Sequence, residues 1–188
     1  MIEYFGYNLI LKYAPKGCRM LELGNQEMNL ADVQNISAKE HFTGLGYDHT
    51  SIDKNGKDGA LALNLSEPII EDLGQFDIVT DAGTTEHVED LYNSLRNTFG
   101  FCAIGGIMIH KNPKTGNFPG HGNHFFTLGF WKSYAKLCKL DILEIFEHPI
   151  YHNTDTGWEC IAVLRKTDNS KFLSKEEFNK ISNLVHKS

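Results

Sequence analysis

Short apolar segments of strand length alternate along this chain with segments that have helical periodicity. Five such apolar segments occupy residues 18–24, 49–53, 60–63, 76–80 and 107–110. Strands joined by helical crossovers pair in parallel, because each crossover returns the chain to the same end of the sheet. The alternation therefore predicts an α/β fold with a doubly wound, mostly parallel sheet.

Two apolar segments near the end of the chain, 142–146 and 159–165, lie too close together for a helical crossover. They are therefore expected to form an antiparallel C-terminal strand pair. Apolar residues at helical spacing predict an N-terminal helix over 3–14 and a C-terminal helix over about 174–186. With 188 residues and no linker or repeat, the chain is expected to form a single domain with a core of about 18–165.

Glycines and polar residues follow the predicted strands at the points where those strands end. Gly24 follows the first strand, where the absence of a Cβ lets a ligand approach the backbone closely. Asp53 follows the second strand, and a carboxylate in that place can accept hydrogen bonds from ribose hydroxyls. Asn64 and Leu65 follow the third strand, and Asp81 follows the fourth. The carboxyl ends of such strands meet at one edge of the sheet, where ligands bind.

Each of these residues also has an ordinary structural explanation. A glycine after a strand is commonly part of a turn, and an aspartate there is commonly a solvated cap. Their order along the chain is more specific, because it resembles that of the class I S-adenosylmethionine-dependent methyltransferases, which have Rossmann-like folds. The resemblance covers about residues 18–165 and is carried by RMLELGN (19–25), TSIDKNG (50–56), ALNLSEP (62–68), FDIVTDAGTTEHVED (76–90) and GGIMIH (105–110).

The resemblance implies a binding site for S-adenosylmethionine. By that resemblance, Glu22 and Gly24 are expected to cradle the methionine end of the cofactor, and Asp53 to bind its ribose hydroxyls. Asn64 is expected to contact the adenine, and Asp81 to flank the cofactor beside the substrate. The expected cofactor-binding residues are Glu22, Gly24, Asn25, Asp53, Asn64, Leu65, Asp81 and His87.

The first motif departs from the family pattern. The family commonly has E/D-x-G-x-G-x-G, whereas this chain has Gln26 and Met28 at the second and third glycine positions. We expect backbone groups and polar side chains of the loop 25–29, beginning with Asn25, to contact the cofactor in place of those glycines. The alternative is a catalytically degenerate S-adenosylmethionine-binding protein with a regulatory or partner role.

A histidine pair lies in the Gly- and Pro-rich loop 111–126 that follows the fifth predicted strand. Methyl transfer needs a nucleophile held in line with the methyl group, and in some cases a base to take its proton. His121 and His124 are the candidate catalytic residues, because imidazole titrates near neutral pH. The loop itself is expected to act as a substrate gate. The alternative is a static loop whose histidines bind its own carbonyl groups.

The same histidine pair also suggests a third function, a zinc or iron enzyme. His121 and His124 would then need a third ligand, such as Asp155, which only the fold could bring near them. Methyl transfer itself requires no metal, because the sulfonium is already activated, and no metal site is expected under that hypothesis.

Composition and charge limit the classes of partner that this protein is expected to bind. A formal charge of −6 without a basic cluster argues against nucleic acid. The longest uncharged apolar run, 99–109, is too short for a membrane span of ~20 residues. The four cysteines form no CxxC pair, and the N-terminus has no secretory pattern, so a cytoplasmic location is expected. The expected acceptor is a small molecule or a sugar-like metabolite, and the sequence leaves the oligomeric state open.

Overall fold

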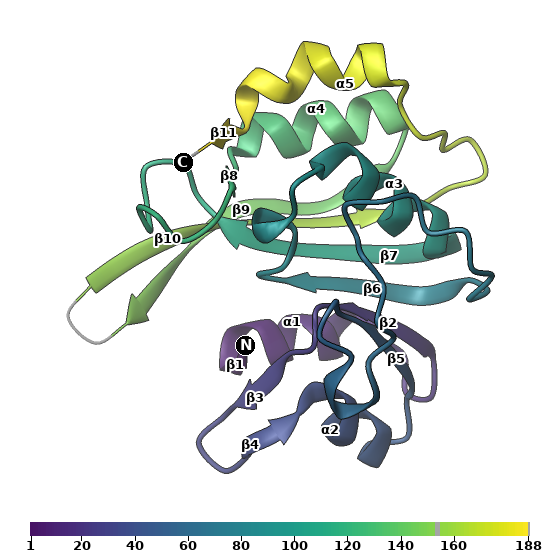
Figure 1. Cartoon of the computed structure of the whole chain (residues 1–188), viewed down its shortest axis with the longest axis vertical. Helices are drawn as coiled ribbons and strands as arrows, with labels where there is room; N and C mark the ends of the chain where they lie inside the picture. The colour runs from purple at the N-terminus through teal and green to yellow at the C-terminus, as the bar shows by residue number, and fades with distance from the viewer. Residues whose placement is uncertain (153–154, 188) are drawn as a thin grey trace.

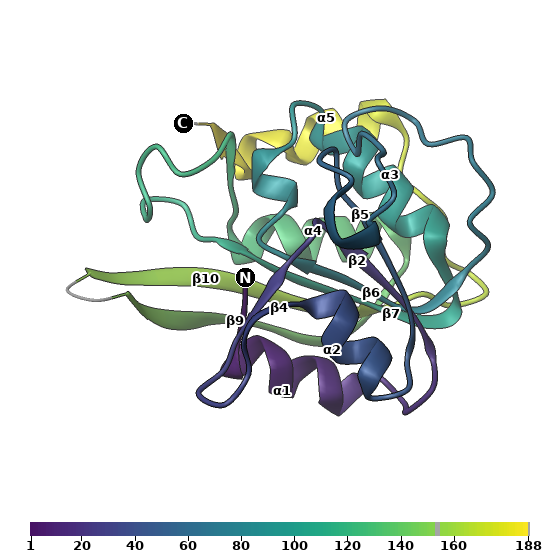
Figure 2. The same cartoon turned by 60° about the horizontal axis from the view of Figure 1, so that its bottom comes forward.

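A six-stranded sheet separates two layers of helices in the computed structural model, which describes residues 1–152 and 155–187 (Figures 1 and 2). In spatial order the strands are β5 (Asp48–Ile52), β2 (Arg19–Leu23), β6 (Phe76–Ala82), β7 (Cys102–Pro113), β10 (Asp155–Arg165) and β9 (Asp141–His152). The first four strands in this order are parallel, whereas β10 is antiparallel to both β7 and β9. The predicted fold class is confirmed, including the antiparallel C-terminal pair.

Successive side chains of the central strands pack on opposite faces of the sheet, as strand geometry requires. In β2, Met20 packs in the cluster formed with α1 (Tyr4–Tyr13) and α2 (Ala38–Gly44). Leu21 and Leu23 belong to the larger cluster on the other face. All three side chains are fully buried, which explains why this strand is an unbroken apolar run rather than an alternating one.

Three helices cover the face opposite α1 and α2 (Figure 1). Asp90, Thr127 and Ser174 begin them, each accepting a hydrogen bond from the backbone N–H three residues later. Such caps satisfy N–H groups that have no partner within the helix. The helices are α3 (Leu91–Phe101), α4 (Leu128–Cys138) and α5 (Lys175–Ile181).

Short strands and 3₁₀ turns complete the described chain. The strands are β1 (Ile2–Glu3), β3 (Glu27–Asn29) and β4 (Gln34–Ser37) in one small sheet, with β8 (His124–Phe125) and β11 (His186–Lys187) paired elsewhere. The turns are η1 (Lys57–Gly59), η2 (Thr85–His87) and η3 (Ser182–Leu184). Within residues 1–152 and 155–187, no helix is long and apolar enough to cross a membrane.

The strand predicted at 60–63 is absent from the sheet. Only one bridge forms there, between Ile52 and Leu61. The backbone beyond it bonds to a side chain instead of a strand, because the Asn97 amide donates to the carbonyls of Leu65 and Glu67. The segment is therefore a loop held against α3, and β5 is the edge of the sheet.

The predicted C-terminal helix over about 174–186 is too long. The helix α5 ends at Ile181, the turn η3 follows, and Val185 is already extended. His186 then pairs with Phe125 of β8. The amphipathic spacing continued beyond the helix, but strand pairing with β8 competes for the last residues.

The chain order places a switch point beside β2. From β2 the chain goes outward to β5 through α2, and then returns to β6 on the other side of β2. Connections that leave in opposite directions open a crevice at the carboxyl ends of the strands, where ligands bind in this class of sheet. The predicted residues after β5 and β2 therefore meet at this edge.

Candidate cofactor and acceptor cavities

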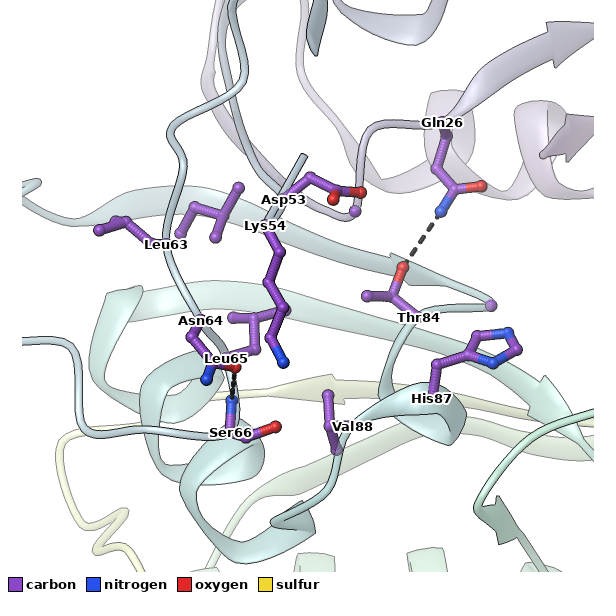
Figure 3. Close-up of a pocket in the computed structure, with 13 residues that line it drawn as sticks. Gln26, Asp53, Lys54, Leu63, Asn64, Leu65, Ser66, Thr84, His87 and Val88 are labelled. Atoms are coloured by element: carbon purple, nitrogen blue, oxygen red, sulfur yellow. Dashed lines mark hydrogen bonds between the residues drawn. The ribbon is translucent and has the colours of Figure 1, made fainter. Parts of the chain in front are cut away.

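A cavity of about 230 Å³ lies at the carboxyl ends of β2, β5 and β6 (Figure 3). Five of the predicted cofactor residues line it, namely Gly24, Asp53, Asn64, Leu65 and His87. We call this space the cofactor cavity. The lining also contains Gln26 of the loop 25–29, together with Lys54, Ser66, Thr84 and Val88, which were not among the expected cofactor-binding residues.

The Asp53 carboxylate is held at the edge of the cofactor cavity by two backbone N–H groups. Oδ2 accepts a hydrogen bond from Asn25 N at 2.9 Å, and Oδ1 accepts one from Asn55 N at 2.9 Å. A carboxylate has about four lone-pair positions, so each oxygen can still accept a bond from a ligand hydroxyl. The side chain is partly exposed and oriented before any ligand arrives.

Side chains bond to one another in the turn after β2. One of them, Gln26, stands where the family motif has its second glycine. Gly24 has a φ of +83°, and a Cβ at this position would be in contact with Thr84 Oγ1 and 2.7 Å from Gln26 Nε2. Gln26 Nε2 donates to Thr84 Oγ1 at 3.1 Å, as Figure 3 shows. Thr84 Oγ1 donates in turn to Leu23 O at 2.7 Å. This chain of hydrogen bonds closes one end of the cofactor cavity.

Glu22 lies behind this turn and not in the cavity lining. It is fully buried, Oε1 accepts a hydrogen bond from Gln26 N at 3.1 Å, and Oε2 lies 3.3 Å from His49 Nε2. Burial raises the pKa of this carboxyl group. Glu22 thus binds the backbone of the loop that carries Gln26, and its contact with the cofactor stays a prediction. Asn25 is also outside the lining, and its side chain donates to Asp58.

The opposite wall of the cofactor cavity is a short apolar surface. Leu63 and Leu65 come from the loop after β5, and Val88 follows η2. The Asn64 amide is used locally, because Oδ1 accepts from Ser66 N at 3.0 Å and Nδ2 donates to Glu67 at 2.8 Å. In Figure 3 the Lys54 side chain points toward this wall. Lys54 lies in the segment TSIDKNG (50–56), directly after Asp53, but was not among the expected site residues.

Asp81 lies inside the protein, at the centre of a polar cluster that also contains Thr85, His110 and Asn112. The residue is 1% exposed. Its Oδ2 accepts hydrogen bonds from Thr85 Oγ1, Asn112 Nδ2 and His110 Nδ1 at 2.5–3.0 Å. Burial opposes ionisation, but the bonds from His110, Thr85 and Asn112 hold the pKa of Asp81 below its usual value. Asp81 lies outside the lining of the cofactor cavity, and its place beside the cofactor stays a prediction.

A second cavity, of about 660 Å³, adjoins the cofactor cavity, and Gly83 and His87 line both. We call it the acceptor cavity. Its wall carries the ion pair of Lys111 Nζ with Glu159 Oε1 at 2.7 Å. Burial raises the pKa of Glu159 to about 7 despite this pairing.

The two predicted catalytic histidines are separated by the structure. His121 lines the acceptor cavity, with Nε2 3.7 Å from Glu86 Oε1, and this carboxylate raises the pKa of His121. His124 is buried in β8, and its Nε2 is 3.0 Å from Val88 O, outside the acceptor lining. The side chain of Asp155, the third ligand of the alternative metal hypothesis, lies outside the described residues.

The loop 111–126 is anchored rather than open. The Phe118 ring lies against Gly157, where any Cβ would collide with the ring. Phe125 is buried in β8. Phe118 lines the acceptor cavity, whereas Phe125 does not.

Comparisons with known proteins bear on the fold. No protein-family model and no curated protein sequence matches this chain. Solved structures do match over 86% of the chain. One is the 1,6-didemethyltoxoflavin-N1-methyltransferase of Burkholderia thailandensis with bound 1,6-didemethyltoxoflavin and S-adenosylhomocysteine, at 13% identity, a TM-score of 0.63 and 76% of that chain covered.

Two further solved structures have a similar fold. The N-methyltransferase NodS of Bradyrhizobium japonicum matches at 15% identity with a TM-score of 0.59, over 94% of its chain. TehB of Haemophilus influenzae matches at 16% identity with a TM-score of 0.61, and this protein spans 61% of its length. The chain therefore has the fold of the class I methyltransferases, which confirms the resemblance at the level of the fold.

Proposed function

We propose that this protein binds S-adenosylmethionine in the cofactor cavity and transfers its methyl group to a small molecule in the acceptor cavity. The observation that carries the proposal is the junction of the two cavities at Gly83 and His87. A methyltransferase needs such a junction, because the reacting atoms must approach to roughly 3–3.5 Å.

The lining of the cofactor cavity fits a nucleoside. Asp53 is oriented to accept hydrogen bonds from the ribose hydroxyls, and its two backbone donors hold it in place without a ligand. The apolar wall of Leu63, Leu65 and Val88 offers a surface for the purine ring. Each ligand atom that these groups bind would be fixed relative to the acceptor cavity.

The amino-acid end of the cofactor requires a change at Gln26. The cavity of about 230 Å³ is smaller than the ~300–1,000 Å³ of common ligand sites. Gln26 and Thr84 close the end that faces the turn after β2. We infer that the Gln26 side chain rotates away when the amino-acid end enters and then contacts it together with the backbone of the loop 25–29.

The chemistry divides between the cofactor and the protein. A bound S-adenosylmethionine supplies an electrophilic methyl group on a sulfonium. The protein orients the acceptor, and His121 or His87 can take its proton, because both imidazoles are exposed to the acceptor cavity. Phe118 covers part of the same cavity and limits access of water.

The acceptor cavity favours a small polar molecule. Glu3, Glu86 and Glu159 supply carboxylates, and Lys111 supplies one cation. Such walls offer many hydrogen bonds to hydroxyl or amino groups, which supports a sugar-like or amine-bearing acceptor. The apolar part of the lining comes from Met1, Ala82, Pro113, Phe118 and Ile150.

Binding of S-adenosylhomocysteine to purified protein tests the cofactor site. Titration calorimetry should give one site per chain, whereas NAD should give no measurable heat. A ligand at 100 times its dissociation constant also adds ~2.7 kcal/mol to stability, which a thermal shift reports. Equal binding of both ligands, or of neither, contradicts the proposal.

A second candidate function is suggested by the closed turn. The Gln26–Thr84 bond stands where a methyltransferase motif has glycines, and a protein that kept this bond could bind the nucleoside without catalysis. Such a protein would bind S-adenosylhomocysteine but show no methyl transfer from labelled S-adenosylmethionine to any acceptor in a metabolite panel. Transfer to one acceptor would exclude this candidate.

A further inference from the structure

One carboxylate and two imidazoles gather at the junction of the cofactor and acceptor cavities. Glu86 Oε1 lies 3.8 Å from His87 Nε2 and 3.7 Å from His121 Nε2. The three ligand atoms all lie within 4.8 Å of one another. His87 and His121 are 34 positions apart in the sequence, and the loop 111–126 brings them together.

These separations are those of neighbouring metal ligands rather than of hydrogen bonds. A hydrogen bond between nitrogen and oxygen spans ~2.7–3.2 Å, so the contacts of Glu86 Oε1 are too long. Ligand atoms about 2.0–2.2 Å from a tetrahedral zinc ion lie roughly 3.3–3.6 Å apart, which is close to the observed spacing. The third separation, between the two imidazole nitrogens, is within 4.8 Å, so the exposed histidine side chains would rotate toward each other to close the three groups around one ion.

The Glu86 carboxylate is buried and points its free oxygen at the two imidazoles. Glu86 is 1% exposed, while the side chains of His87 and His121 are 48% and 51% exposed. Its other oxygen, Oε2, accepts a hydrogen bond from Asn112 Nδ2 at 3.2 Å. A buried carboxylate requires a compensating partner, and a cation between the two histidines would supply one.

The supporting contacts hold this geometry without an ion. Asn123 N donates to Glu86 O at 2.7 Å, and Asn123 Nδ2 donates to His87 O at 3.0 Å. A Cβ at Gly122 would lie 2.9 Å from Glu86 O, so only glycine permits this approach of the loop. Together with Asn112, these contacts orient the ligands from behind, as outer-shell residues do in metal sites.

We propose that Glu86, His87 and His121 bind a divalent transition-metal ion, Zn²⁺ or Mn²⁺, at the junction of the two cavities. Two imidazoles and one carboxylate suit such ions better than Mg²⁺, which prefers oxygen ligands throughout. The three protein ligands leave coordination positions open toward the acceptor cavity. The binding site itself stands independently of methyl transfer.

The role of the ion rests on the proposed function. An acceptor hydroxyl that occupies an open position would be oriented beside the cofactor cavity, and its pKa would be lowered by the ion. With the ion bound, His87 and His121 are ligands and no longer act as bases, so the proton would leave the hydroxyl oxygen for solvent. The oxygen would then be ready to form the bond to the methyl carbon as the sulfur–carbon bond breaks. This set of ligands shares His121 with the metal hypothesis drawn from the sequence and has Glu86 and His87 as its other two members.

The test is direct titration of metal into chelator-treated, tag-free protein that holds no S-adenosylmethionine or S-adenosylhomocysteine. Calorimetry with Zn²⁺ and with Mn²⁺ should show one site per chain for at least one of them, and Mg²⁺ should bind at least tenfold more weakly. His121→Ala should weaken binding by tenfold or more. His186→Ala, which removes an exposed imidazole in β11, is the matched control and should bind as the unmodified protein does.

Three results would overturn the site: no binding of Zn²⁺ or Mn²⁺, equal binding by His121→Ala, or equal binding of Mg²⁺. Glu86→Gln provides a second variant, because glutamine retains an oxygen for Asn112 while removing the charge, and circular dichroism checks that it is folded. Since no cofactor is present in this titration, its failure is separate from a failure of S-adenosylhomocysteine to bind.

Discussion

Two aspartates near the ends of β5 and β6, the strands on either side of β2, have opposite environments. Asp53, after β5, is partly exposed in the cofactor cavity and accepts bonds from two backbone N–H groups. Asp81, in β6, is buried and accepts bonds from side chains of the polar cluster. The difference shows that a carboxylate can bind a ligand only where the protein leaves its lone pairs unused.

The largest effect should come from Asp81→Ala. Removing this carboxylate leaves the buried His110 imidazole without its carboxylate partner, whereas Asn112 loses one bond and keeps its bonds to two other side chains. Breaking such a buried pair costs about 3–5 kcal/mol of unfolding free energy. Urea unfolding followed by circular dichroism measures this change. Asp53→Ala is the comparison and should lose only about 1–2 kcal/mol, because its lost bonds are to partly solvated backbone groups. Equal losses in the two variants would contradict the assigned difference.

Asp53→Ala should have the larger effect on ligand binding. Losing a charged partner of the ribose costs ~1.5–3 kcal/mol, which corresponds to a tenfold to hundredfold weaker affinity for S-adenosylhomocysteine. Titration calorimetry measures it. Asp58→Ala serves as control, because Asp58 accepts a bond from the Asn25 side chain but does not line the cavity. If both variants weaken binding alike, Asp53 acts by holding the loop and not by contacting the ribose.

Acid pH should distinguish the two carboxylates through stability. The pKa of Asp81 in the folded state lies below its value in the unfolded chain, which is about 3.9. The unfolded state therefore binds its proton first as pH falls, and the stabilisation present above pH ~4 is lost as pH falls through the folded pKa. The slope is at most about 1.4 kcal/mol per pH unit for one proton. Between pH 6 and 2, the unfolding free energy of Asp81→Asn should therefore fall less steeply with falling pH than that of the unmodified protein. Equal slopes in the two proteins would contradict the lowered pKa of Asp81.

The smallest expected effect is a change in amide hydrogen exchange on ligand binding, which also shows which residues contact the ligand. Adding S-adenosylhomocysteine should slow exchange of the amides in residues 24–30, because the loop after β2 must close on the amino-acid end. The amides of β6 around Asp81 are buried in the sheet and should not change. Protection confined to β6, or absent from 24–30, would mean that this loop does not contact the cofactor.

The sequence was sufficient for the class of fold and for most strands. Apolar runs on both faces of β2, β6 and β7 mark buried parallel strands, and this property depends only on neighbours in the chain. Gly24, Asp53 and Asn64, which the sequence pattern grouped together, do line one cavity in the structure. The prediction of a strand at 60–63 was wrong. Pairing with Ile52 stops after one bridge, and the Asn97 side chain binds the backbone that follows.

Contacts between distant segments were decided only by the tertiary structure. No local pattern shows that Asp81 is surrounded by His110 and Asn112, since those residues come from β7 and meet it across the sheet. The same holds for His121, which pairs with Glu86 while its neighbour His124 turns toward Val88. Local spacing determines which elements form, because their hydrogen bonds are short-range. Which side chains share a site depends on how sheets and loops bring residues together that are tens of positions apart, and the sequence pattern does not encode those distances.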